Sequence, residues 1–164
     1  MRPPIESRTL TVEDLYHLPD EDEKYELQAG LLLSEPLPGF THGRIASRVA
    51  WFLTEHADRN ELGEVVTNDT FFVLARDPDT VRGPDVAFVT RERVRTLTDP
   101  ERAFPGPPDL AVEVLSPSNT PTDVRAKVAD YLAAGTRLVW VFDSVRETVT
   151  IYRSLLEPRV LRHD

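Results

Sequence analysis

Apolar residues recur along the chain with helical spacing in some segments and with strand spacing in others. Helical spacing predicts a short helix over 11–18, a long helix over 41–59 and a third helix between the cap residue Thr120 and Gly135. The residues expected on the buried face of the long helix are Ile45, Val49, Phe52 and Leu53.

Strand spacing, with turn residues between the runs, predicts the other elements. The run LAVEVLS at 110–116 is almost continuously apolar, which is typical of a central strand covered on both faces. Residues 91–108 are polar and rich in proline, so we expect a connection with one helical turn. The other expected strands are a hairpin over 24–35 turning at Ala29-Gly30, a strand pair over 63–75 turning at Asn68-Asp69, a strand over 85–90, and a hairpin formed by 138–143 and 148–154. This order predicts an α/β (α+β) fold, in which helices flank a central mixed β-sheet.

The length of 164 residues suits one domain, because two domains of half that size would each bury a poor core. We expect residues 1–8 to form a loose N-terminal leader and residues 9–164 to form that single domain. The chain has no cysteine, and no apolar run approaches the roughly 18 residues that a membrane span requires. Its first residues lack the apolar core of a secretion signal, so we expect a soluble, cytoplasmic protein without a membrane partner.

The net charge argues against a nucleic-acid partner. The chain carries a formal charge of −9, whereas proteins that bind nucleic acid usually present a basic surface to the phosphates. Clustered carboxylates are, however, what a metal site needs, and a bound cation offsets part of their charge. The 17 arginines can also gather on one face of the fold. The charge therefore weakens the case for DNA binding without excluding it.

Glu113 is the residue that most strongly indicates chemistry, because it interrupts the apolar run LAVEVL. A buried carboxylate without a partner costs several kcal/mol, so a fold tolerates it where a cation meets it. Asp85 follows Gly83-Pro84 and starts another apolar strand, and adjacent strands would bring the two carboxylates to one cation. The alternatives are that Glu113 faces water on an edge strand or forms a structural ion pair with an arginine.

Lys127 is one of only two lysines in a chain with 17 arginines, which suggests that this position needs a lysine. An ammonium is a compact charge whose pKa falls on burial, whereas a guanidinium stays protonated. Lys127 flanks the apolar stripe of the third helix and can point its ammonium toward the sheet. The alternative is an ion pair with Asp123 on a solvated helix face, worth roughly a few tenths of a kcal/mol.

The sequence also contains an ordered series of strings, spread over about residues 9–153. They are LTVEDLYHLP, YELQAGLLL, the Thr41-His42-Gly43 helix start, RGPDVAFV, PPDLAVEVLSPSN, the D-x-x-x-K motif from Asp123 to Lys127, AGTRLVWVFD and TVTIYR. Together they resemble the Uma-type restriction endonuclease family, formerly a domain of unknown function, in the PD-(D/E)XK nuclease superfamily. The resemblance implies a restriction-endonuclease-like core that hydrolyses phosphodiester bonds in DNA with the help of a metal ion.

The same resemblance implies roles for individual residues. Asp85 corresponds to the Asp of the PD element and Glu113 to the (D/E) element, and both would hold Mg²⁺, with Mn²⁺ as a substitute. Glu26, in the string YEL, corresponds to a further active-site carboxylate. The superfamily pattern would place a lysine two residues after Glu113, but Leu115 stands there, and Lys127 looks like a migrated replacement.

Several interpretations stay open. His42, in the first turn of the long helix, can bind phosphate or relay protons, or it is a structural imidazole near a helix start. The resemblance implies DNA as the partner and, because restriction-type nucleases often cut as dimers, a homodimer. The rival functions are a catalytically inactive nuclease-fold module that binds nucleic acid or a protein, another hydrolase with paired carboxylates such as a glycosidase, and a structural protein. The acidic net charge and Leu115 favour the inactive module.

Overall fold

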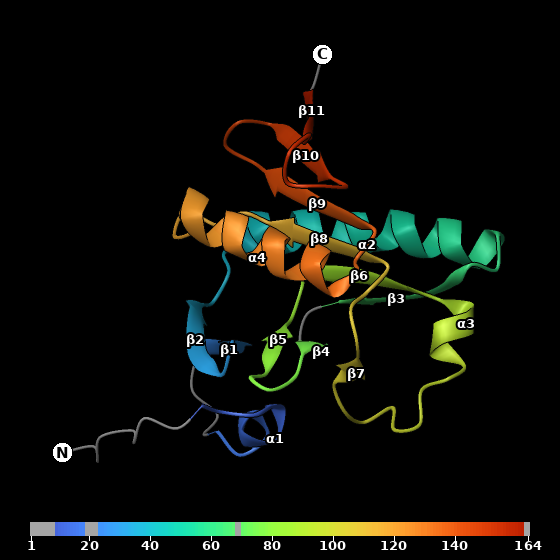
Figure 1. The fold of residues 1–164 in the computed structure, drawn as a ribbon. Helices are drawn as coiled ribbons and strands as arrows, with labels where there is room; N and C mark the ends of the chain where they lie inside the picture. The colour runs from blue at the N-terminus through green and yellow to red at the C-terminus, as the bar shows by residue number, and fades with distance from the viewer. Residues whose placement is uncertain (1–8, 19–22, 68–69, 163–164) are drawn as a thin grey trace.

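The computed structural model describes residues 9–18, 23–67 and 70–162, and Figure 1 shows how their elements are arranged. A six-stranded mixed sheet lies between helix α4 (Pro121–Ala134) in front and helix α2 (Phe40–Arg59) behind. This arrangement confirms the predicted mixed sheet flanked by helices. A five-stranded sheet, which the sequence pattern does not predict, lies below α4 together with the short helix α1 (Val12–Leu15).

The two sheets have the strand orders β11-β10-β9-β8-β6-β3 and β2-β1-β5-β4-β7. The first consists of Gly63–Thr67 (β3), Val86–Thr90 (β6), Leu110–Val114 (β8), Leu138–Asp143 (β9), Thr148–Tyr152 (β10) and Arg159–Arg162 (β11). The second consists of Glu23–Gln28 (β1), Leu31–Pro36 (β2), Phe72–Ala75 (β4), Thr80–Arg82 (β5) and Phe104–Pro105 (β7). Helix α3 (Arg91–Val94) is the helical turn expected within 91–108. None of the helices in the described ranges combines the length and the apolar character that crossing a bilayer needs.

Strand β8 lies inside the six-stranded sheet, as its apolar run predicts. All five of its residues are buried, and it pairs antiparallel with β6 and parallel with β9. One face of the sheet packs against Val128 and Tyr131 of α4, and the other packs against Ala46 of α2. Because both faces are covered, a charged residue in β8 has to find its partner inside the protein.

The long helix α2 is present, but two details of its prediction are wrong. It begins at Phe40, one residue before the predicted start at Thr41. Phe52 is 62 % exposed, while the other three residues of the predicted buried face pack against the core. The flank of α2 that carries Phe52 therefore remains apolar and open.

The strands between 63 and 75 also differ from the prediction. β3 pairs with β6 in the six-stranded sheet, whereas β4 pairs with β5 in the other sheet, so the expected strand pair is wrong. The turn expected at Asn68-Asp69 lies outside the described residues. The hairpin of β1 and β2 is confirmed, and its turn residues Ala29 and Gly30 have φ angles of 49° and 76°, as a two-residue hairpin turn requires.

Helix α4 is confirmed at both ends. The backbone N–H of Asp123 donates to the hydroxyl of Thr120, and the Asp123 carboxylate accepts the Thr120 hydroxyl at 2.6 Å. At the other end, Gly135 has a φ of 105°, which suits a glycine cap. The caps fix the start and the end of α4 relative to β8 and β9, and they thereby set where Lys127 meets the sheet.

Candidate active site

Asp85 and Glu113 lie side by side where β6 and β8 meet. The two strands are antiparallel, with Val86 opposite Val112, and this register places Asp85 opposite Glu113 on the same face of the sheet. Both carboxylates line a pocket of about 210 Å³. The structure therefore brings together the two residues that the sequence singled out.

Asp85 is held through one of its two oxygens. Its Oδ2 accepts the backbone N–H of Val114 at 2.7 Å and lies 3.0 Å from Nε2 of His42, in the first turn of α2. Burial opposes the ionisation of Asp85, but the hydrogen bond with His42 and the charge of Lys24 outweigh it and lower the pKa of Asp85. The same hydrogen bond raises the pKa of the His42 imidazole. His42 thus has the geometry of a residue that orients Asp85.

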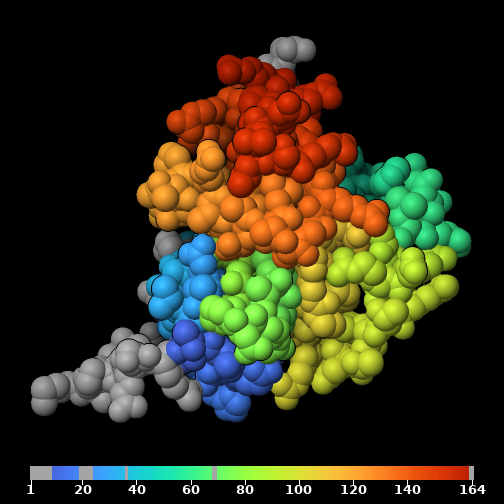
Figure 2. Space-filling model, in the orientation of Figure 1, coloured from blue at the N-terminus to red at the C-terminus, as the bar shows by residue number. Residues whose placement is uncertain are grey.

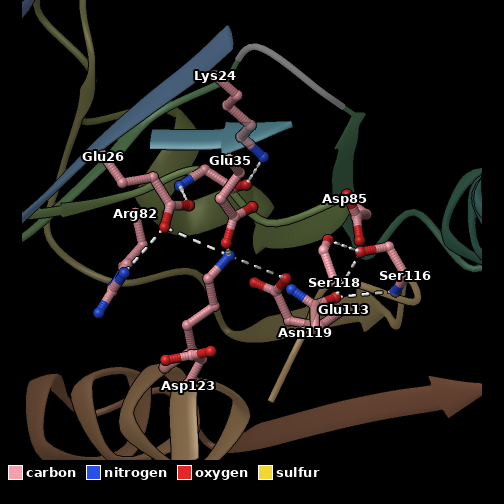
Figure 3. A network of polar contacts seen from close by, with 12 residues as sticks. Lys24, Glu26, Glu35, Arg82, Asp85, Glu113, Ser116, Ser118, Asn119 and Asp123 are labelled. Atoms are coloured by element: carbon pink, nitrogen blue, oxygen red, sulfur yellow. Dashed lines mark hydrogen bonds and ion pairs between the residues drawn. The ribbon is translucent and has the colours of Figure 1, made fainter. Parts of the chain in front are cut away.

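Lys127 reaches the same place from α4. Figure 3 shows the carboxylates of Glu26, Glu35 and Glu113 that converge there. The Lys127 Nζ lies 2.7 Å from Oε1 of Glu35, 3.3 Å from Oε2 of Glu26 and 3.5 Å from Oε2 of Glu113. The alternative of an exposed ion pair with Asp123 is wrong, because the Lys127 side chain is buried and the Asp123 carboxylate caps the helix. The Lys127 ammonium therefore lies beside Glu113, where a lysine at position 115 would have placed its ammonium; this chain has Leu115 instead.

The ionisation of Glu113 reflects its burial. Burial raises the pKa of Glu113 to about 7 against the opposing effect of Lys127, and Asp85 and Glu26 add to the rise. The hydroxyl of Tyr131, on α4, donates to Oε1 of Glu113 at 2.7 Å. Burial alone would lower the pKa of Lys127, but the three surrounding carboxylates raise it. Near neutral pH, a protonated ammonium therefore faces a carboxyl group that is partly protonated.

Glu26 lies behind Lys127 and does not line the pocket. It is fully buried and accepts hydrogen bonds of 2.9 Å from the guanidinium of Arg82 and from the backbone N–H of Gly83. Arg82 in turn lies 2.6 Å from Asp130 of α4. Burial would raise the pKa of Glu26, but Lys127 and the other cations outweigh it and lower that pKa. Glu26 therefore influences the pocket through its contact with the Lys127 ammonium.

Gly83 links the site to the second lysine of the chain. A Cβ at this position would lie 3.0 Å from Cε of Lys24 and 3.2 Å from the ring of Phe71, so only glycine fits without a shift. The Gly83 carbonyl accepts a hydrogen bond from the Lys24 ammonium, and Lys24 lines the pocket that holds Asp85. The backbone at Gly83 and Pro84 therefore positions the Lys24 ammonium as well as the start of β6.

Sequence reasoning missed four residues of the site. Lys24 carried a usable signal, because it is the other of only two lysines. Glu35 is the cross-strand partner of Lys24 in the β1–β2 hairpin, so the hairpin register would have placed it. Tyr131 fits the apolar spacing of α4, which indicates a buried ring and says nothing of its hydroxyl, and Arg82 does not stand out among 17 arginines. Only the fold shows that these side chains converge.

The donor set limits what kind of metal ion this site can hold. Within the described ranges, no three or more His, Asp or Glu side chains are grouped to bind a metal ion, and the chain contains no cysteine. Asp85 and Glu113 offer two carboxylates to the pocket. This set fits a hard cation that keeps several waters, such as Mg²⁺, and does not fit a closed structural zinc site.

The fold and the paired carboxylates define a protein of the restriction-endonuclease-like class, and comparison with known proteins identifies the family. The chain belongs to the Uma2 family, described as "Putative restriction endonuclease", whose model matches residues 12–163. A solved structure of "a putative nuclease belonging to DUF820" from Anabaena variabilis ATCC 29413 is similar over 94 % of this chain and 85 % of that chain. It has a TM-score of 0.79 at 22 % sequence identity, so this likeness concerns the fold. No curated protein matches the chain.

Glu113→Gln should change how stability depends on pH in metal-free buffer. Folding raises the pKa of Glu113 from 4.5 to about 7, so between these values the folded protein binds more protons and loses stability as pH rises. Glutamine does not titrate. The free energy of unfolding of the variant, relative to that of the wild type, should therefore rise by on the order of 1–3 kcal/mol as the pH goes from about 5 to about 8. Chemical denaturation in the presence of a chelator measures the change, and the exposed Glu61→Gln serves as the control. A stability difference that is the same at both pH values would contradict the assignment.

Proposed function

We propose that this protein is a metal-dependent endonuclease that hydrolyses phosphodiester bonds in DNA. The observation that carries the proposal is the convergence of Asp85, Glu113 and Lys127 on one pocket. Two carboxylates from adjacent strands and a lysine are the parts that metal-assisted hydrolysis of a phosphodiester needs. A charged group inside a central strand is costly, and perturbed carboxylates of this kind cluster at functional sites.

The cation would be Mg²⁺, with Mn²⁺ as a substitute, held by Asp85 and Glu113. Mg²⁺ in proteins is commonly bound by one or two carboxylates together with waters and substrate phosphates, which matches the donors present. Once bound, the ion would polarise the scissile phosphate and lower the pKa of the attacking water. His42 would keep Asp85 oriented toward it through their 3.0 Å contact.

The two lysines would divide the work on the substrate. Lys127 would orient the attacking water and stabilise the negative charge that builds up on the phosphate. Glu26 and Glu35 support this role, because they hold the ammonium in place and keep it protonated. Lys24 would hold a phosphate oxygen as the substrate enters. Both lysines of an otherwise acidic chain line this pocket, so an anionic substrate would meet two ammonium groups there, and a bound cation would offset the charge of the carboxylates that also line it.

The inactive nuclease-fold module remains the second candidate. The net charge of −9 and Leu115, which lines the pocket in place of a strand lysine, favour it. In such a module Lys127 would serve only to neutralise the three carboxylates around it. The two candidates differ in metal-dependent turnover, which the active enzyme has and the module lacks.

Asp85→Asn should abolish the binding of Mg²⁺ and Mn²⁺. Asparagine keeps an oxygen that can accept the Val114 N–H, so the fold should survive while the charge is lost. Isothermal titration of both cations into the wild type and the variant tests this, with the half-exposed Asp99→Asn as the control. In the wild type, DNA cleavage should require the cation and stop in excess chelator. Cleavage that persists in chelator would exclude this mechanism.

Lys127→Ala should reduce turnover by roughly two orders of magnitude or more, because its charge acts on the transition state. It should also lower the melting temperature, since three carboxylates lose their shared cation. Lys127→Arg should rescue turnover poorly, because a planar guanidinium differs in reach and shape. Adding Leu115→Lys to Lys127→Ala returns a cation to the strand and should restore part of the rate. Arg125→Ala, exposed on the same helix, is the control. A folded Lys127→Ala protein that cuts at the wild-type rate would show that the lysine is structural.

Lys24→Met should weaken the binding of substrate more than it slows turnover. A cation that holds a phosphate contributes to ground-state binding, so the apparent KM should rise while kcat changes less. The dependence of DNA affinity on salt should also become shallower, by about one unit in the log–log slope. Fluorescence anisotropy over a salt series measures this. Arg95→Met, at an exposed position outside the pocket lining, is the control. An unchanged KM and salt slope would remove Lys24 from the binding site.

A further inference from the structure

The face of the six-stranded sheet that packs on α2 is only partly covered. The main contacts of α2 are with β3, β6 and β8, while β10 and β11 extend past it at the top of the molecule (Figures 1 and 2). On β9, β10 and β11, Phe142, Val149 and Leu161 are successive register partners and form an apolar row on one face. Trp140 and Phe142 belong to the cluster that includes Ala46 of α2, so this row continues the face that α2 covers.

A groove of about 590 Å³ lies between the open flank of α2 and the part of this row formed by Phe142 and Val149. Beside it Trp51 is 59 % exposed, and Phe52, which lines it, is 62 % exposed. Aromatic residues grouped around an exposed apolar groove are typical of protein–protein interfaces. The apolar residues that line the groove are Ile45, Val49, Phe52, Leu53, Trp140, Phe142 and Val149.

The two walls of the groove carry opposite charges. Arg44 and Arg48 lie on the α2 wall, and Asp143 and Glu147 lie on the wall formed by the β9–β10 turn. A two-fold axis through the groove brings the α2 wall of one copy against the turn wall of another, so opposite charges meet twice. The phosphates of a nucleic acid would be attracted by the arginines of one wall and repelled by the carboxylates of the other. The charges therefore favour a second copy of this chain over nucleic acid.

We propose that a second copy of this chain docks in this groove to form a two-fold symmetric homodimer. Trp51 and Phe52 of each copy pack on the apolar row of the other, and Arg48 of each copy faces Glu147 of the other. Asp143 contributes less, because its carboxylate already binds Arg146 of its own turn at 2.7 Å.

This interface adjoins the candidate active site, because α2 contributes to both. His42, which contacts Asp85, and Arg48 lie on the same helix, about 9 Å apart along its axis at the usual rise per residue. Both pockets of the dimer would thus lie close to the interface, an arrangement suited to cutting both strands of a duplex. That consequence rests on the proposed nuclease function, whereas the dimer itself does not.

Sedimentation velocity without DNA or metal ions tests the dimer independently of catalysis. The wild type at about 50 µM should sediment with twice the chain mass of 18.6 kDa. Arg48→Glu and Glu147→Arg should each weaken the dimer at least tenfold, because each places two like-charge pairs across the interface. An equal mixture of the two variants should regain the dimer, because the heterodimer contains one wild-type pair and one reversed pair. Both residues are exposed, so both variants should fold, which circular dichroism checks.

The controls are Arg125→Glu and Glu92→Arg, which reverse exposed charges outside the groove and should leave the dimer unchanged. Three results would overturn the proposal. The first is a wild type that stays monomeric at this concentration. The second is a dimer that neither substitution weakens, which would place the interface elsewhere. The third is a mixture that stays monomeric, because Arg48 and Glu147 would then not face each other. A monomer whose DNA affinity falls with Phe52→Ser would assign the groove to nucleic acid instead.

Discussion

The buried ammonium of Lys127 balances three carboxylates that come from three strands, and the rest of the site depends on that balance. Glu26 lies on β1, Glu35 on β2 and Glu113 on β8, so one cation ties the hairpin of the smaller sheet to the central strand of the larger one. Removing one partner of a buried ion pair typically costs about 3–5 kcal/mol, because the remaining charge is left uncompensated. The lysine is therefore part of the tertiary structure before it takes part in any chemistry.

The two carboxylates in the pocket are chemically different, although they lie opposite each other in one sheet. Asp85 has a lowered pKa because His42, Lys24 and the backbone N–H of Val114 support its charge against the effect of burial. Glu113 has a raised pKa because the effect of its burial outweighs the charge of Lys127 and its neighbours include other carboxylates. Two like charges at close range avoid full repulsion when one of them holds its proton. The site can therefore form before any cation arrives.

The sequence predicted those parts of the site that depend on local pattern. Glu113 stood out because a charge interrupts an apolar run, and Lys127 stood out because lysine is rare in this chain. The cap residues around α4 defined that helix to the residue. Glu35 and Arg82 could not be found in this way, because each is an ordinary charged residue whose partners lie far away in the sequence.

The errors in the fold have a similar cause. The segments 63–67 and 72–75 look like the two halves of a hairpin, but they join different sheets, and pairing with β6 and β5 decides their positions. Phe52 fits the spacing of a buried helix face, yet it lines an open groove beside the sheet and therefore stays largely exposed. Residue spacing describes one element at a time, whereas burial depends on which elements meet.

The path from β5 to β6 is only three residues long, and it carries the backbone from one sheet to the other. Gly83, Pro84 and Asp85 form this passage, with Glu26 and Lys24 bound to the backbone of Gly83 and Val114 bound to the side chain of Asp85. Proteins often open in cooperative units smaller than the whole molecule, and such units often coincide with supersecondary motifs. If the smaller sheet separates as one unit, Lys127 loses Glu26 and Glu35 and Asp85 loses Lys24, while the larger sheet remains folded. The free energy needed to disrupt the candidate active site would then be lower than the free energy of global unfolding. An intact site would therefore report that the two sheets are in contact.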